Sequence, residues 1–417
     1  MTLTSTASSS PPTVRGERLL ADLAMLARIG GTPAGGVSRP AYSDHDVAAR
    51  RVVRDRMTSA GLDVRIDAAG NSFGRRRGRE PGLPPLVIGS HTDTVPDGGR
   101  FDGALGVLAA IEVARTLDDS GIVLRHPLDV VDFQNEEGGL VGSKIVAGRL
   151  DADSLDLVAV SGFSLRDGIS RLGGDPGRLA DSRLDAGSVA GYLELHIEQG
   201  RILERSGTAI GIVEGLVGIQ YWEIVFEGVA SHAGTTPMTD RHDALLAAAR
   251  FVDAVNDVVT SRTGRQVGTV GRLAVFPGGA NVIPGRVVLT LELRDLDPAV
   301  IGWLFERVEE RALRIASATG TRVALTPTHH NAPSPTHPAA RRAVGDAAAA
   351  LGLSSLDMVS GAGHDAQNMA TLCPAGMIFV PSVNGISHSP HERTEDRDVV
   401  NGAAVLLGAL LRLDEAL

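Results

Sequence analysis

The sequence predicts an α/β layer architecture with a largely parallel sheet, interrupted by a smaller α+β domain. Three observations support this fold class. Apolar runs of strand length alternate with helical patterns between residues 62 and 133, the pattern changes after about residue 214, and the alternation resumes from residue 339. Strands and helices that alternate with short links are typical of a parallel sheet with helices on its faces.

The first part of the chain begins with two predicted helices. Apolar residues at helical spacing predict one over residues 16–30. Ser43 is a possible N-cap for a second over residues 44–60. Apolar runs and alternation predict the next elements: a half-exposed strand at 62–66, a buried strand at 85–89, a helix at 104–117 and a buried strand at 128–133.

The middle of the chain has a different order of elements. It predicts strands at 221–226, 267–275, 286–293 and 323–326 and helices at 243–258 and 299–318. The segment at 329–338 is rich in proline, asparagine and histidine, which is typical of a linker.

These patterns predict the domain organisation. We expect a disordered tail at 1–15, because that segment is polar and rich in serine and proline. One domain is expected to comprise 16–214 and 330–417, and a smaller α+β sandwich domain to be inserted at 215–329.

Composition excludes several classes of protein. The formal net charge of −10 disfavours a nucleic-acid or anionic-membrane partner. The single cysteine, Cys373, excludes an internal disulfide framework and fits a reducing compartment. The longest apolar stretch, at 403–411, is far shorter than a membrane span, and the first residues lack the apolar run of a signal peptide. We therefore expect a cytoplasmic protein without a membrane partner.

Two candidate ligand positions lie at the ends of predicted elements, one after a strand and one before a helix. His91 follows a buried strand, and α/β sheets place ligands at the carboxyl ends of their strands. Asp93 is a possible partner that fixes the tautomer of His91. Asp102 and Gly103 open a helix, where a carboxylate can bridge two cations and glycine permits close backbone approach. Alone, His91 could instead cap the strand, and Asp102 could be a helix N-cap.

Three further segments add carboxylates and imidazoles. Glu136 and Glu137 follow a buried strand, and such adjacent carboxylates repel each other unless a metal on one leaves the other free as a general base. His196 shares the polar face of a possible strand with Glu194, and His388 lies on a loop rich in glycine and serine. Alone, these segments could be a solvated acidic loop and surface histidines.

Together the five segments form a mixed nitrogen and oxygen donor set. Such a set suits a pair of Zn²⁺-like ions. Its members are His91, Asp102, Glu137, His196 and His388. Competing motifs are weaker: the match to a nucleophile elbow at 70–74 lacks a following helix, and the glycine-rich segment at 361–363 lacks a complete dinucleotide fingerprint.

The order of these motifs resembles the hydantoinase/carbamoylase family, the amidohydrolase branch of the dinuclear zinc-peptidase superfamily. The resemblance runs from about residue 17 to the end of the chain. The matching segments are HTDTV, FDG, NEEG, LHIEQG, SHAGTTPM, GGANVIPG, LELRD, SGAGHDA and GISHSPHERT. The family implies a zinc-peptidase-like catalytic domain with a central mixed sheet and a smaller lid and dimerisation domain.

The resemblance also implies roles for the metal-site residues. One divalent ion (Zn, Mn, Co or Ni) would be held by His91, Asp102 and His196, and a second by Asp102, Glu137 and His388. Glu136 would be the general base for attack of metal-bound hydroxide. His196 stands where peptidase relatives carry a carboxylate, which favours the amidohydrolase branch.

Substrate residues are implied in the same way. Gln199 would contact the ureido or amide end of a small carboxylate substrate, and Gly363 and His364 would line its pocket. His232, Asn281 and Arg294 of the inserted domain would reach substrate, commonly across the interface of a homodimer. Arg294 would bind its carboxylate. Alone, Arg294 could pair with Asp295, and the other two residues could occupy turns.

The chain departs from the family after Glu137, because Gly138 and Gly139 lead into Gly142-Ser143 through a shorter loop. The substrate is therefore open between two classes. An N-carbamoyl amino acid or related ureido carboxylate is the first, and an N-acyl amino acid or dipeptide is the second. A non-catalytic binding protein on the same fold is the third alternative.

Overall fold

The structure is a computed structural model that describes residues 12–417, divided into two units. The first unit comprises residues 12–214 and 336–417, and the second comprises residues 215–335. Most of the tail expected at 1–15 falls on residues 1–11, which lie outside the described residues. Within residues 12–417, no helix is long and apolar enough to cross a membrane.

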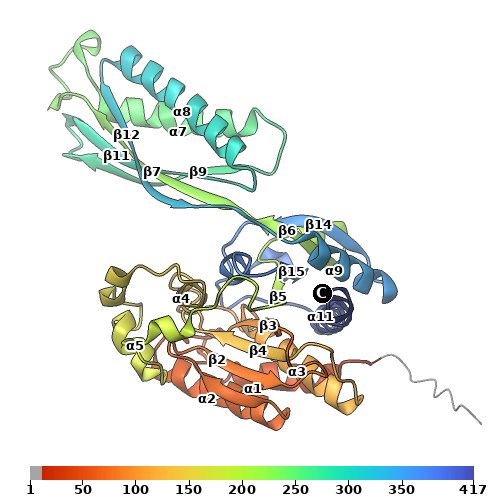
Figure 1. Cartoon of the computed structure of the whole chain (residues 1–417). Helices are drawn as coiled ribbons and strands as arrows, with labels where there is room; N and C mark the ends of the chain where they lie inside the picture. Colours follow the sequence, from red (N-terminus) through yellow and green to blue (C-terminus); the bar gives the residue numbers. More distant parts are fainter. Residues whose placement is uncertain (1–11) are drawn as a thin grey trace, which may run out of the picture. The chain divides into compact units, whose positions relative to one another are not determined.

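A nine-stranded mixed sheet, built mainly from the first unit, underlies the candidate site (Figure 1). Its strands are β1 (Asp63–Ile66), β2 (Ser72–Arg76), β3 (Leu86–His91), β4 (Leu128–Phe133), β5 (Gly191–Ile197), β6 (Ile210–Leu216), β13 (Ser334–Pro335), β14 (Ser355–Ser360) and β15 (Ala375–Val380). They run in the order β1-β2-β4-β3-β5-β15-β6-β13, with β14 paired to β6. The interior pairs β4–β3, β3–β5 and β5–β15 are parallel.

The helices of the first unit cover this sheet with apolar faces. They are α1 (Gly16–Leu26), α2 (Asp44–Ser59), α3 (Ala104–Asp119), α4 (Val141–Val146), α5 (Leu165–Arg171), α6 (Ile202–Ser206), α9 (Pro338–Ala350), α10 (Ala366–Met369) and α11 (Asp396–Ala416). One hydrophobic cluster joins the sheet to α1, α2, α3, α9 and α11. A smaller cluster includes buried side chains of α4 and α5.

The predicted elements around the site are confirmed, with changed ends. The strand expected at 128–133 is β4, and the helix expected at 104–117 is α3, which runs to Asp119. The strand expected at 85–89 is β3, which extends to His91. The helix expected at 16–30 ends at Leu26, because the chain then turns through Gly30 at a φ of 83°. The Ser43 hydroxyl caps α2, as expected, by accepting the backbone N–H of Asp46.

The second unit is a four-stranded antiparallel sheet with two helices on one face (Figure 1). Its elements are β7 (Gly218–Glu227), β8 (Ser231–His232), α7 (Ala244–Thr260), β9 (Val267–Phe276), β10 (Val282–Ile283), β11 (Arg286–Asp295), α8 (Pro298–Thr319) and β12 (Arg322–Asn331). The sheet order is β12-β7-β11-β9, and β8 and β10 form a separate two-stranded sheet.

The linker expected at 329–338 contains the boundary between the two units, at residues 335 and 336, although parts of it belong to regular elements. β12 continues to Asn331, β13 follows at Ser334–Pro335, and α9 begins at Pro338. The composition predicted a linker throughout, but residues 329–331 pair with β7 and are extended as the end of β12. This sheet context overrides the local propensity.

Candidate metal centre and active site

The candidate ligands lie where parallel strands end. His91 is the last residue of β3, His196 lies near the end of β5, and Glu136 and Glu137 follow the end of β4. Because these three strands run parallel, their carboxyl ends meet at one edge of the sheet. Asp102 joins them from the loop before α3.

Asp102 lies between three imidazoles. Its Oδ1 atom is 3.2 Å from His196 Nε2 and 3.6 Å from His91 Nε2, and its Oδ2 atom is 3.4 Å from His388 Nε2. Burial opposes ionisation of the carboxyl, but His196, His388 and His91 hold its pKa well below the ordinary value. The N-cap of α3 is Gly103, without a side-chain cap. The carboxylate therefore faces the histidines, and the helix N-cap alternative for Asp102 is wrong.

Gly103 is required for this approach. Its φ is 62°, and a Cβ atom there would lie 2.3 Å from His91 Nε2. A side chain at this position would push the imidazole away from Asp102. The expectation that glycine permits close approach at this point is confirmed.

Three groups of side chains have donor atoms within 4.8 Å of one another and could hold a metal ion, and two of them share Asp102. These two comprise His91, Asp102 and His196, and Asp102, Glu137 and His388; the third comprises Glu194, His196 and His364. His91 Nδ1 faces the backbone oxygen of Asp93 at 3.0 Å, and His196 Nδ1 faces that of Ile197 at 2.9 Å. A proton on each Nδ1 atom leaves Nε2 as the ring nitrogen that faces Asp102, and this nitrogen binds a metal ion once it carries no proton. The donor set therefore fits a pair of divalent ions.

Glu136 lies beside these groups with its carboxylate directed at His91. Its Oε2 atom is 3.7 Å from His91 Nε2, and its Oε1 atom is 3.9 Å from His364 Nδ1. Burial raises the pKa of this carboxyl well above its ordinary value against the effect of His91, and the Glu137 carboxylate adds to the rise. A basic carboxylate at this place can accept a proton from a nucleophile held between the two groups.

Asp93 orients Glu136 through the backbone. The Asp93 carboxylate accepts the N–H of Glu136 and the N–H of Glu137, each at 3.2 Å. The backbone carbonyl of Asp93, rather than its carboxylate, is the hydrogen-bonding partner of His91. Asp93 therefore fixes the His91 tautomer, as expected, but through its backbone oxygen, while its Oδ1 atom lies 3.7 Å from the same ring nitrogen.

Arg50, which the sequence did not single out, supports this arrangement from α2. The buried guanidinium donates to the backbone oxygens of Asp132 and Phe133 at the end of β4, and it lies 3.6 Å from Asp93 Oδ1. It also pairs with Asp46 at 2.9 Å. One cation thus ties a helix to the segment that precedes Glu136.

Glu392 performs a similar function on the other side of the site and was also not predicted. Its Oε1 atom accepts the backbone N–H of Phe101 at 2.8 Å and of Asp102 at 3.1 Å. Its Oε2 atom accepts the hydroxyl of Ser387 at 3.0 Å, and that hydroxyl lies 2.7 Å from Asp102 Oδ2. The loop that carries His388 is therefore fixed to the loop that carries Asp102.

Gln199 and His388 adopt positive φ angles of 59° and 52° at the site. The Gln199 amide nitrogen donates to Asp102 Oδ2 at 2.7 Å and lies 3.5 Å from His388 Nε2. Left-handed backbone in residues other than glycine concentrates at functional sites. The structure thus brings the Gln199 side chain to the carboxylate that the two candidate ligand groups share.

His364 lies in the same cluster. Its ring centroid is 4.4 Å from that of His196, and its Nε2 atom is 3.1 Å from the hydroxyl of Ser360. Its buried Nδ1 atom has no hydrogen-bond partner among the described residues. Burial and the neighbouring His196 lower the pKa of this imidazole well below its ordinary value, so it is neutral. Gly363 precedes it on the same loop.

His232 and Asn281 are neighbours in the second unit. His232 in β8 pairs with Val282 in β10, and the backbone oxygen of Asn281 accepts the N–H of Ala233 at 2.9 Å. His232 Nδ1 accepts the N–H of Gly234 at 3.0 Å. The histidine therefore has the turn-capping contact noted as an alternative, and this contact directs Nε2 away from the turn.

Arg294 lies at the far end of β11 from these two residues. It lies eight positions after Arg286, where β11 begins shortly after β10, which corresponds to roughly 27 Å of strand. Its guanidinium pairs with Glu292 on the same strand. The expected alternative partner, Asp295, is not the partner in this ion pair.

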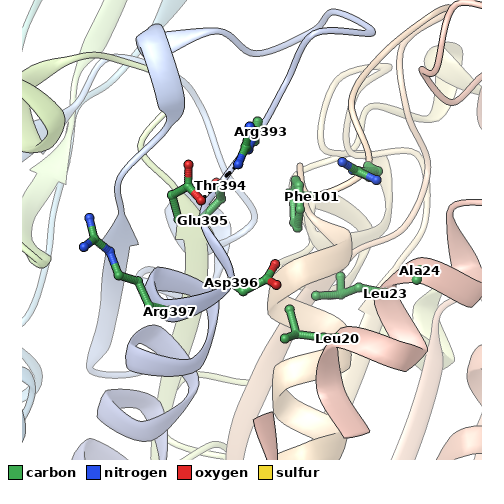
Figure 2. Close-up of a pocket in the computed structure, with 10 residues that line it drawn as sticks. Leu20, Leu23, Ala24, Phe101, Arg393, Thr394, Glu395, Asp396 and Arg397 are labelled. Atoms are coloured by element: carbon green, nitrogen blue, oxygen red, sulfur yellow. Dashed lines mark hydrogen bonds and ion pairs between the residues drawn. The ribbon is translucent and has the colours of Figure 1, made fainter. Parts of the chain in front are cut away.

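A hollow of about 790 Å³ lies elsewhere in the first unit (Figure 2). It is lined by Leu20 and Leu23 of α1, by Phe101 and by the segment 393–397 before and within α11, where Arg393 pairs with Glu395 at 3.1 Å. None of the clustered histidines or carboxylates of the candidate site lines it. Its size therefore does not identify the place where chemistry occurs.

Comparisons with known proteins agree with this geometry. Residues 87–412 match peptidase family M20/M25/M40. An N-carbamoyl-L-amino acid amidohydrolase of Geobacillus stearothermophilus is 41% identical over 405 residues, covering 96% of this chain and 99% of that protein. A ureidoglycolate hydrolase of Arabidopsis thaliana is 37% identical over 401 residues, covering 93% of this chain and 84% of that protein.

Solved structures give the same result. The crystal structure of an amidase of the hydantoinase/carbamoylase family from Burkholderia multivorans superposes with a TM-score of 0.90 at 40% identity. It covers 97% of this chain, which covers 99% of that one. The similarity therefore extends over both units and over all the clustered residues.

Proposed function

The chain belongs to peptidase family M20/M25/M40, in its hydantoinase/carbamoylase branch, and on this premise we propose that it cleaves the C–N bond of an N-carbamoyl amino acid or a related small ureido carboxylate. It is a metal-dependent amidohydrolase. The observation that carries the proposal is Asp102 between two ligand groups, with Glu136 beside them. The substrates named for the two relatives are both ureido carboxylates.

Two divalent ions are part of the proposal. His91, Asp102 and His196 would hold one ion, Asp102, Glu137 and His388 would hold the other, and the mixed donors suit Zn, Mn, Co or Ni. When bound, such a pair supplies Lewis acidity for the substrate carbonyl and lowers the pKa of water.

Glu136 would transfer a proton during this reaction. Its carboxylate accepts a proton from the attacking water as the oxygen bonds to the ureido carbon, and returns it to the leaving nitrogen as the C–N bond breaks. Asp93 holds the Glu136 backbone during both transfers. Gln199 would orient the ureido end, and Gly363 and His364 would line the pocket around it.

Substrate binding by the second unit is also proposed. His232 and Asn281 would stabilise the developing oxyanion, and Arg294 would bind the carboxylate with its planar guanidinium. The strand length between Arg286 and Arg294 is much greater than a small ureido acid. Both ends of one second unit therefore cannot contact one substrate, which supports a homodimer in which each copy supplies one end.

The surface of the second unit supports the same dimer. β9 is an edge strand of its sheet and exposes Val267, Leu273 and Phe276. An exposed edge strand with apolar side chains is a template for pairing with a second chain. We expect the dimer to form through this unit, which corresponds to the lid and dimerisation domain at 215–329.

A cytoplasmic location completes the proposal. The single cysteine, Cys373, is buried and free. A thiol without a disulfide partner is typical of a reducing compartment.

The test is ammonia release from N-carbamoyl-L-amino acids, β-ureidopropionate and allantoate, with protein reconstituted separately with Mn²⁺ and Zn²⁺. We expect ammonia from at least one of them, because the carbamate released by ureido cleavage decomposes to ammonia and carbon dioxide. A folded, metal-loaded sample that releases none from the whole panel contradicts the proposal.

A second candidate is an N-acyl-amino-acid hydrolase or dipeptidase. One observation favours it: only three residues separate Glu137 from α4, and two of them are glycines. This short segment leaves room for an N-substituent other than carbamoyl. Acyl or amino-acid release without ammonia would establish this second function instead of the first.

A further inference from the structure

A small recess lies beside Glu137 in the first unit. Its volume is about 50 Å³, and it is lined by Asp93, Thr94, Asn135, Glu137 and Gly138 together with several apolar residues. Those apolar residues are Pro40, Ala41, Val95, Pro96, Ala159 and Val160. A space of roughly 10–15 Å³ by this measure holds one water molecule, so the recess admits about three or four carbon atoms.

The segment after Glu137 keeps this recess open. A Cβ atom at Gly138 would lie 2.0 Å from Asn135 Oδ1, and Gly139 has a φ of 118°, which side-chain-bearing residues avoid. Gly139 therefore favours glycine for its backbone, a side chain at Gly138 would displace the Asn135 amide, and neither position places a side chain over Glu137. The turn is closed by hydrogen bonds from the N–H groups of Gly139 and Leu140 to the Glu136 oxygen, at 2.9 and 2.8 Å.

The polar groups of the recess are already engaged. The two oxygens of Asp93 accept backbone N–H groups, and the Asn135 amide nitrogen donates to the Tyr42 hydroxyl at 3.1 Å. The Thr94 hydroxyl lies 2.9 Å from the Val95 oxygen. An occupant gains apolar contact here and no new hydrogen bond, while the carboxylates of Asp93 and Glu137 disfavour an anionic occupant.

The mouth of the recess carries an exposed valine. Val160 is 74% exposed, on a turn closed by a hydrogen bond from the Ala159 N–H to the Phe163 oxygen. A valine in water gains free energy when another apolar group covers it. A group that fills the recess would contact this side chain.

We propose that the recess receives an aliphatic side chain on the substrate's α-carbon, so the chain prefers ureido acids of small aliphatic amino acids over those with a hydroxyl or a carboxylate there. This inference rests on the proposed function, because it places the reacting C–N bond beside the carboxylates of Glu137 and Asp102. It distinguishes the two substrate types named for the relatives. An N-carbamoyl aliphatic amino acid fills the recess, whereas the hydroxyl of a ureidoglycolate does not.

The experiment compares kcat/KM of the metal-loaded protein for the N-carbamoyl derivatives of glycine, L-norvaline and L-aspartate. Each buried methylene contributes roughly fourfold, so norvaline is expected to exceed glycine by about tenfold or more. The kcat/KM for the L-aspartate derivative is expected to be lower than that for the L-norvaline derivative. Val160→Asn should lower the ratio of norvaline to glycine about threefold or more.

Val158→Asn is the matched control. Val158 lies in the same segment and is 68% exposed, but it does not line the recess, so the ratio should not change. The inference is overturned if kcat/KM for the norvaline derivative is no higher than that for the glycine derivative. It is also overturned if the two substitutions change the ratio equally.

Calorimetric binding of the free amino acids to the same metal-loaded proteins separates this inference from the proposed function. If no ureido acid is hydrolysed, the proposed function fails. Tighter binding of L-norvaline than of glycine, weakened by Val160→Asn alone, would still support the recess. Equal binding of both amino acids would overturn it.

Discussion

The carboxylate of Asp93 holds the backbone N–H of Glu136 through a hydrogen bond of 3.2 Å, and it accepts the N–H of Glu137 at the same distance. One buried side chain thus fixes both the expected general base and an expected metal ligand. Arg50 lies 3.6 Å from the same carboxylate and supplies the opposite charge.

Asp93→Asn should impair this arrangement without changing its shape. An asparagine offers one accepting oxygen, so one of the two backbone N–H groups loses its partner, at a cost of about 1–3 kcal/mol. We expect a lower melting temperature and a loss of about 10-fold to 100-fold in kcat or metal affinity. Asp97→Asn is the control, because Asp97 is exposed on the same loop. Equal effects of the two substitutions would contradict the role given to Asp93.

Glu136→Gln and Glu137→Gln should separate the proton carrier from the ligand. Glu136→Gln removes the base but keeps both ligand groups, so metal content should be retained while kcat falls about 10²-fold or more. Glu137→Gln removes a ligand from the group of Asp102 and His388, so metal content should fall. The checks are elemental analysis and steady-state kinetics of both variants. An active Glu136→Gln enzyme would refute the assigned role.

The metal groups were predictable because their members stand next to strong local signals. His91 and Glu136 follow apolar runs that form buried strands, and Asp102 precedes a glycine that opens a helix. Their convergence could be expected because parallel strands end at one edge of a sheet. Of the two antiparallel strands at one edge of the sheet, alternation predicted β1 at 62–66, but the short β2, only Ser72–Arg76, had no comparable signal.

Arg50 and Glu392 could not be predicted, because their importance arises only in three dimensions. In the sequence, Arg50 is one of several arginines on a polar helix, and its complete burial depends on the close approach of Asp46, Asp93 and Asp132. Glu392 lies in a loop and contacts backbone amides at residues 101 and 102, almost three hundred positions away. No local pattern marks a residue whose partners lie so far away in the chain.

Metal affinity should rise with pH. The hydrogen bond to Asp102 and the nearby Glu137 carboxylate raise the pKa of the His388 imidazole to about 9, against the effect of burial. For His91, burial opposes the charge, but Glu136 and Asp102 raise the pKa well above its ordinary value. In the metal-free protein both imidazoles therefore hold a proton at neutral pH, and an incoming ion must displace it.

Calorimetry of Mn²⁺ binding between about pH 6 and about pH 9 checks this expectation. Each displaced proton strengthens binding about tenfold per pH unit, until the imidazole is already neutral above its raised pKa. Repeating the titration in buffers of different ionisation enthalpy counts the released protons directly. An affinity that is constant over this range would contradict the proton displacement.

Complementation between inactive variants tests the proposed homodimer. Arg294→Gln removes the carboxylate-binding group, and His232→Ala removes a group at the other end of the second unit. Each variant alone should lose most of its activity. If each site takes Arg294 from one copy and His232 from the other, a mixed dimer has one site with both changes and one site with neither.

Mixing the two variants under conditions that exchange subunits should therefore restore about one quarter of the wild-type activity. If both residues act from the same copy, every site carries one change and activity stays at the level of the separate variants. Sedimentation of the mixture measures whether dimers form, so a lack of restored activity in intact mixed dimers would exclude the shared site.

Leu273→Asp on the exposed edge strand β9 provides the corresponding test of the interface, because a charge at a paired edge should shift the protein toward the monomer.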